Sequence, residues 1–213
     1  MATGLRERKK QQTRELLAET ARRLFSERGF ERVSVAEIAR VADVSEKTVF
    51  NYFPTKEDLV YWWLESFEDE LLATVRSREV GESVLDAFGR FVRQPRGMLG
   101  QYDREARERL AALTRMIVES PSLIAREQQI FQGYTASLAG LIAQETGAEP
   151  DAVEPWVAAN AMMGVHRRLI DFTRGRIIAG ARHPELAADV LAEADRGLAL
   201  LADGLGGYAV KEP

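Results

Sequence analysis

The stretch SVAEIARVADVSEKTVFNYFPTKEDL, residues 34–59, is the most informative part of this chain about its fold. Ser34 precedes an apolar stripe whose spacing places it on one face of a short helix, with Ser34 as its N-cap. The stripe consists of Val35, Ile38, Ala39 and Ala42. Asp43 marks a tight turn of the kind that often needs a left-handed backbone, which Asp tolerates better than most residues. Ser45 caps a second short helix that ends at Tyr52, so the pair predicts a helix-turn-helix, whose second helix can enter a major groove.

The second of these helices has two different faces. Val49 and Phe53 fall on one face and continue the core begun by Val44. The other face and its edge carry side chains that suit contacts with base edges: Glu46, Lys47, Thr48, Phe50 and Asn51. Asn pairs with adenine, Lys reaches guanine, and Thr or an aromatic ring touches a thymine methyl group, whereas Glu has to accept from a cytosine amino group. The alternative is a solvated amphipathic helix with an exposed Phe.

The flanks of this unit supply groups for phosphate. Thr55 can cap the next helix, and the Lys56 ammonium and Tyr52 hydroxyl can bind one phosphate there. Ser34, with the amides that follow it, can bind another. Four basic residues near the N-terminus predict a flexible arm that follows the DNA backbone or minor groove, or else a frayed, solvated terminus. They are Arg6, Arg8, Lys9 and Lys10.

The whole chain is expected to be all-α, with about nine helices packed as a bundle, because no alternating strand pattern occurs between its Gly and Pro breaks. The first helix is predicted from about Arg8 to Arg28, and Gly29 provides a left-handed cap. Its buried stripe consists of Leu17, Ala21, Leu24 and Phe25. A fourth helix is predicted on the i+4 stripe of Leu59, Trp63, Phe67 and Leu71.

Composition narrows the class of protein. The net charge of −4 hides an asymmetry, because residues 1–56 hold 12 Lys and Arg against 8 Asp and Glu, and residues 57–213 hold 17 against 25. This indicates a polyanionic partner for the first part only. The absence of cysteine excludes disulfides, thiolate metal sites and thiol nucleophiles. No apolar run is long enough to span a bilayer and no secretory signal opens the chain, so we expect a cytoplasmic protein that does not bind membranes.

The pattern FSERGF-(x3)-SV-(x2)-IA-(x2)-ADVSEKTVFNYFPTKEDL resembles the DNA-binding signature of the TetR (tetracycline repressor-like) family of bacterial regulators, with Asp43, Phe50 and Asn51 in place of the usual Gly, Tyr and His. The resemblance implies a dimer, with a three-helix DNA-binding domain over residues 1–56 and an effector-binding and dimerisation domain over residues 57–213. It also implies base contacts at Glu46, Lys47, Thr48, Phe50 and Asn51. The phosphate contacts that it implies are Ser34, Tyr52 and Lys56.

Residues 57–213 contain scattered aromatic and methionine side chains that either fill an ordinary core or line a cavity for a small apolar or amphipathic effector. The resemblance implies such a cavity, and its candidate lining residues are Phe88, Phe91, Tyr102, Met116, Phe131, Tyr134, Trp156, Asn160, Met163 and His166. The predicted helices over residues 154–172 and 185–205 suit a two-fold interface, or else burial within one subunit. The second helix presents Leu186, Val190, Ala194, Leu198, Leu201 and Leu205.

Catalysis is not expected, because no nucleophile, metal-binding or nucleotide-binding motif occurs. We expect neither a cofactor nor a metal. The sequence therefore predicts a dimeric, sequence-specific DNA-binding transcriptional regulator, a repressor released from a palindromic operator by a small molecule. The alternative is an architectural DNA-binding or interaction protein of the same fold without an effector.

Overall fold

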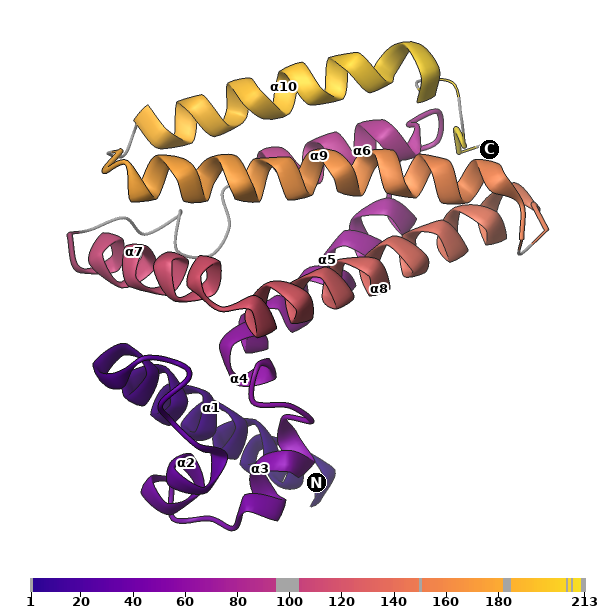
Figure 1. The fold of residues 1–213 in the computed structure, drawn as a ribbon. Coiled ribbons are helices and arrows are strands. Elements are labelled where there is room, and N and C mark those ends of the chain that lie inside the picture. The colour runs from indigo at the N-terminus through magenta and orange to yellow at the C-terminus, as the bar shows by residue number, and fades with distance from the viewer. Residues whose placement is uncertain are drawn as a thin grey trace. The chain divides into compact units, whose positions relative to one another are not determined.

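The structure is a computed structural model that describes residues 2–94, 104–149, 151–181, 185–205, 207 and 209–211. These residues form helices without an extended strand, which confirms the all-α prediction (Figure 1). The described part contains ten α-helices, against about nine expected. They are α1 (Ala2–Arg28), α2 (Val35–Val41), α3 (Glu46–Tyr52), α4 (Asp58–Tyr61), α5 (Glu65–Arg76), α6 (Val84–Arg93), α7 (Arg104–Glu119), α8 (Pro121–Thr146), α9 (Val153–Ile178) and α10 (Glu185–Leu205).

The chain folds into two compact units. Unit 1 consists of Met1–Glu65 and Arg115–Glu127, and unit 2 of Ser66–Thr114 and Gln128–Pro213. Unit 1 therefore contains the end of α7 and the start of α8 in addition to the N-terminal helices. The functional boundary expected between residues 56 and 57 stays a prediction.

Helix α1 supplies the central buried face of unit 1 and contacts α2 and α4. Its predicted stripe is confirmed, since Leu17, Ala21, Leu24 and Phe25 are all buried. Gly29, with φ of +83°, ends the helix by donating its N–H to the Phe25 carbonyl at 2.8 Å. The helix begins at Ala2 and not near Arg8, so the prediction of a flexible arm is wrong for this structure. The basic segment is rich in Arg, Glu, Lys and Gln, which are good helix formers without any buried stripe.

The predicted fourth helix is divided, which accounts for the extra helix. A single 3₁₀ turn, Trp62–Leu64, separates α4 from α5. Leu59 and Leu64 are buried in unit 1, whereas Leu71 is buried in unit 2, so the segment serves two different cores. A 3₁₀ turn inside a helix changes the direction in which its faces point. The side chain of Trp63 lies outside the described residues.

In unit 2, α10 runs along α9, and both contact α6 (Figure 1). Helices α9 and α10 approach each other closely at Gly197 of α10, where a Cβ atom would lie 3.0 Å from Cγ1 of Val165 in α9. Three members of the α10 stripe expected at a dimer interface are buried inside the subunit: Leu186, Ala194 and Leu198. For these three, the alternative of burial within one subunit is correct, because they pack in the core that α10 shares with α9 and α6.

The C-terminal strap, residues 209–211, lies against the turn between α5 and α6 in unit 2. Val210 forms an isolated antiparallel bridge with Ser83, and Gly81 donates its N–H to the Lys211 carbonyl at 2.8 Å. The buried Arg78 donates to the carbonyls of Val75 at 2.8 Å and Ala209 at 3.2 Å. Arg78 also forms an ion pair with Glu145 of α8. The guanidinium thus holds strap, turn and helix together.

Candidate nucleic-acid interface

The α2–turn–α3 unit forms by local capping, as predicted. The Ser34 hydroxyl accepts from the Glu37 N–H at 3.2 Å, and the Ser45 hydroxyl accepts from the Thr48 N–H at 3.1 Å. Asp43 has φ of 55°, so the turn uses the left-handed conformation. These features confirm the predicted helix starts and the predicted turn, and they fix the direction in which α3 leaves α2.

Helix α3 buries one side and exposes the other. Val49 and Phe53 are 1% exposed, whereas Phe50 is 46% exposed. Glu46, Lys47 and Asn51 are also exposed, and Thr48 is half-buried. The Thr48 hydroxyl lies 2.8 Å from the Ser45 hydroxyl, so part of its hydrogen-bonding capacity is used within the cap. The helix therefore presents the five predicted base-contact side chains from one short element.

The predicted phosphate contacts lie at the ends of these short helices. Ser34 is the exposed N-cap of α2, Tyr52 is the half-buried last residue of α3, and Lys56 follows in the next turn. The Lys56 ammonium lies 4.0 Å from the ring centroid of Phe30. Partial burial lowers the pKa of Lys56, while Glu31 and Glu57 oppose this effect. The ring orients the ammonium group by a cation–π contact and leaves its N–H donors for a further partner.

The cap predicted at Thr55 takes the form of a reciprocal pair with Asp58, the first residue of α4, while Glu57 directly before α4 makes no side-chain cap bond. The Asp58 carboxylate accepts from the Thr55 N–H at 2.9 Å, and the Thr55 hydroxyl accepts in turn from the Asp58 N–H at 3.3 Å. This reciprocal pair fixes the segment that contains Lys56.

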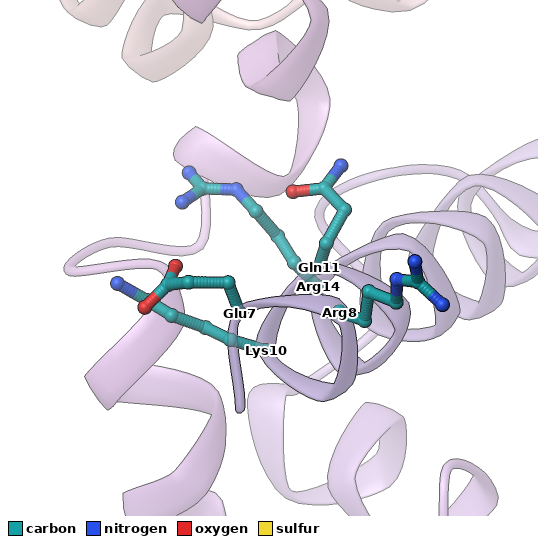
Figure 2. A pocket seen from close by; sticks show the side chains of 5 residues that line it. All are labelled: Glu7, Arg8, Lys10, Gln11 and Arg14. Carbon is teal, nitrogen blue, oxygen red and sulfur yellow. The ribbon is translucent and has the colours of Figure 1, made fainter. Parts of the chain in front are cut away.

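The exposed N-terminal part of α1 borders a shallow polar groove of about 430 Å³ (Figure 2). Its lining side chains are Glu7, Arg8, Lys10, Gln11 and Arg14. Arg14 also lies over the ring of Phe53, with 4.8 Å from its guanidinium carbon to the ring centroid. The basic residues of this segment are thus held along a helix that packs on the core beneath α3.

Four aromatic rings meet in unit 2, one from each of four helices. Phe67 of α5 lies 4.5 Å from His166 of α9, 5.1 Å from Phe91 of α6 and 5.2 Å from Tyr134 of α8, measured between ring centroids. Phe131 joins this aromatic cluster, with 5.7 Å between its centroid and that of His166. Burial raises the pKa of Tyr134, and Glu68 raises it further.

The aromatic cluster contains four of the ten effector candidates: Phe91, Phe131, Tyr134 and His166. Phe88 and Met163 are also buried in unit 2. Trp156 is 49% exposed, and Asn160 donates its side-chain N–H to the Trp156 carbonyl at 2.8 Å. Met116 belongs to unit 1, and Tyr102 lies outside the described residues.

Sequence reasoning missed the centre of the cluster and the ion pair beside the Thr55 turn. The i+4 spacing of Phe67 predicts a core stripe and carries no signal that distinguishes a ligand-lining ring from a core ring. Arg126 donates to Asp58 at 2.7 Å across 68 positions of sequence. No local pattern reports such a pair.

The part of the chain that the structure describes lacks two kinds of feature. No helix there is long and apolar enough to cross a membrane. No group of three or more His, Asp or Glu side chains in the same residues is arranged to hold a metal ion.

Two family patterns match this chain. "Bacterial regulatory proteins, tetR family" matches residues 17–61, the segment that contains α2 and α3. "MftR C-terminal domain" matches residues 82–206, more than half of the chain.

Similar curated proteins are transcriptional regulators. The chain is 29% identical over 150 residues to the HTH-type transcriptional regulator TcmR of Streptomyces glaucescens, an alignment that covers 70% of this chain and 66% of TcmR. It is 25% identical over 166 residues to the putative mycofactocin biosynthesis transcriptional regulator MftR of Mycobacterium tuberculosis, covering 74% of this chain and 78% of MftR. The likeness extends beyond the DNA-binding helices in both cases.

The fold is also found among solved structures. NalD, the secondary repressor of the MexAB-OprM multidrug efflux pump in Pseudomonas aeruginosa, aligns with a TM-score of 0.51 at 20% identity. The alignment covers 88% of this chain and 97% of NalD. At this identity, the likeness concerns the fold alone.

Proposed function

This chain belongs to the tetR family of bacterial regulatory proteins and is a DNA-binding transcriptional regulator, and we propose that it is a repressor that binds a palindromic operator as a homodimer and leaves it when a small molecule binds. The regulators among its relatives do not favour an architectural protein of the same fold. Because its partner is bacterial DNA, we place the protein in the cytoplasm.

The observation that carries the DNA-binding part is the exposed face of α3. A Phe that is 46% exposed between exposed Lys47 and Asn51 has no role in the subunit core, because Val49 and Phe53 already fill it. In a major groove the same face meets base edges, with Asn51 suited to adenine and Phe50 to a thymine methyl group. Ser34, Tyr52 and Lys56 then hold the phosphates on either side.

The exposed apolar residues of α9 and α10 support a homodimer. Val153, Trp156 and Val157 of α9 are 49% to 62% exposed, and Leu200 of α10 is 82% exposed. Two-fold pairing of these helices would remove the four side chains from water. The two recognition helices of such a dimer would read half-sites about 34 Å apart, one turn of DNA.

The aromatic cluster supports an apolar or amphipathic effector in unit 2. Its rings are already in contact, so an effector would have to separate them and take over their apolar contacts. The buried Tyr134 hydroxyl and the His166 ring offer polar groups to orient it. A 100-fold loss of DNA affinity would need about 2.7 kcal/mol of coupling.

A selection of bound fragments from genomic DNA tests this proposal, followed by fluorescence anisotropy on a recovered duplex and a scrambled one. Asn51→Ala is expected to lose about 1–3 kcal/mol of discrimination at particular base pairs. Lys56→Ala is expected to weaken both duplexes and to reduce the slope of log K against log salt concentration by about 0.9. Equal losses on both duplexes for Asn51→Ala would contradict the division of roles, and no preference by the unaltered protein would contradict the function.

A further inference from the structure

The end of α7 and the start of α8 are built into unit 1. Ile117, Ser120 and Leu123 are all buried. The Ser120 hydroxyl donates to Glu31 at 2.8 Å, and the Tyr61 hydroxyl donates to the Leu123 carbonyl at 3.0 Å. The segment Arg115–Glu127 is therefore attached to both the turn after α1 and helix α4.

A single carboxylate joins this segment to the Thr55 turn. Oδ1 of Asp58 accepts from Nε of Arg126 at 2.7 Å. Oδ2 of the same carboxylate accepts from the Thr55 N–H at 2.9 Å and from the Thr55 hydroxyl at 2.8 Å. The Asp58 side chain is 14% exposed and that of Arg126 is 32% exposed, so water screens the pair less than it screens a surface pair.

The turn held by Asp58 contains Lys56 and directly follows α3. A shift of the carboxylate changes the Thr55 turn, and the turn sets where the Lys56 ammonium lies beside Phe30. Removal of Arg126 would also take away the cation that is hydrogen-bonded to this largely buried carboxylate and leave it only the electrostatic interaction with Arg14, which favours rearrangement of the turn.

We propose that Arg126 is a positioning residue for DNA binding: through Asp58 it holds the Thr55–Lys56 turn in the conformation that contacts phosphate. The chain enters the segment from unit 2 after Thr114 and returns to unit 2 at Gln128. The role rests on the proposed phosphate contact of Lys56.

The test compares Arg126→Met, which keeps the length of the side chain, with Arg126→Lys, which keeps its charge. Arg23→Met is the matched control, because Arg23 forms an ion pair with Glu27 on the exposed side of α1 in the same unit. Anisotropy with a duplex selected by the unaltered protein is measured over a salt series. Hydrogen–deuterium exchange of the peptide over residues 54–60 is measured on the full chain without DNA.

Arg126→Met is expected to weaken duplex binding about fivefold or more and to lower the salt slope by about 0.9, as Lys56→Ala does. In the double variant with Lys56→Ala, Arg126→Met should weaken duplex binding by less than a further twofold, since the same phosphate contact is already lost. Arg126→Lys should recover most of the affinity, and Arg23→Met should match the unaltered protein. Hydrogen–deuterium exchange over residues 54–60 should be faster in Arg126→Met than in the unaltered protein, and it should be unchanged in Arg23→Met.

An unchanged salt slope in Arg126→Met, with losses that add to those of Lys56→Ala, overturns the positioning role. If Lys56→Ala itself leaves the salt slope unchanged, the proposed phosphate contact of Lys56 is wrong. The exchange measurement then tests the other claim, that Arg126 holds the Thr55–Lys56 turn. Faster exchange over residues 54–60 then sustains the positioning of the turn, and exchange equal to that of the unaltered protein refutes it. If Arg126→Met unfolds, Arg126→Gln, which removes the charge and keeps a polar side chain, takes its place in the same comparisons.

Discussion

Asp43 shows how one residue sets the angle between α2 and α3. Its φ of 55° is a conformation that costs most L-residues about 1–2 kcal/mol, and less for Asp because its short side chain can bond locally. A Gly at this position would avoid the steric cost, but the chain forms the turn with Asp43. The turn therefore depends on a residue that tolerates the left-handed region.

Asp43→Val is expected to lower the free energy of unfolding by about 1–2 kcal/mol, because a β-branched residue is strongly disfavoured at positive φ. Denaturant unfolding followed by circular dichroism measures the change. Asp43→Gly is the control and should retain the stability of the unaltered protein. Equal stability for the Val and Gly variants would contradict the account of the turn.

Residues with local roles were predictable from sequence, and residues with distant partners were not. Ser34 and Ser45 act within three residues of themselves, so hydroxyl position and helix pattern sufficed. Arg126 and Asp58 meet only because α8 begins inside unit 1. Phe67 fits a core stripe equally well whether or not a His ring stacks on it.

At the scale of elements, α3 separates stability from recognition on its two faces. Phe53 is 1% exposed and Phe50 is 46% exposed, although both are large apolar residues within four positions. The first contributes to the core of unit 1, and the second gains little from burial within the chain. Truncation to Ala should therefore lower mainly the stability at Phe53 and mainly the DNA affinity at Phe50.

Phe50→Ala is expected to change the free energy of unfolding by no more than about 0.5 kcal/mol and to weaken operator binding about fivefold or more. Phe53→Ala is the contrasting variant and should lose about 3–5 kcal/mol of stability. Thermal denaturation and anisotropy on the selected duplex measure both quantities. A stability loss in Phe50→Ala as large as that in Phe53→Ala would argue against an exposed recognition face.

The division of the fourth helix was not predictable from its i+4 stripe. The spacing of Leu59, Phe67 and Leu71 fits one continuous helix. The spacing does not indicate where the chain passes from the core of unit 1 to the core of unit 2. The 3₁₀ turn at Trp62–Leu64 lies just before that passage. A pattern that counts apolar residues cannot distinguish one core from two.

At the scale of the whole molecule, several of the exposed apolar side chains in the described residues lie on α9 and α10. The sequence predicts a two-fold interface on these two helices, which stays a prediction, and part of the α10 stripe that it assigns to the interface is buried inside the subunit. Periodicity shows which residues share a face, and a helix with apolar residues on more than one face does not reveal which of them meets a second subunit. Exposure in the structure identifies Leu200 as a better candidate than Leu198.

Leu200→Glu is expected to shift the protein from dimer to monomer, because the introduced charge would have to be buried at the proposed interface. Light scattering after size exclusion should then give 23.8 kDa in place of twice that mass. Val80→Glu is the control, since Val80 is 61% exposed in the turn between α5 and α6. A dimer that survives Leu200→Glu would exclude this part of α10 from the interface.

The C-terminal strap has a practical consequence for handling the protein. The Lys211 ammonium donates to the carbonyls of Arg76 at 3.3 Å and Arg78 at 3.0 Å, at the end of α5. An affinity tag or fluorophore joined directly after this strap would disturb a segment that donates hydrogen bonds to carbonyls at the C-terminal end of α5. A reporter is better attached at an exposed position in the middle of α8, such as Gln132, which lies outside the strap.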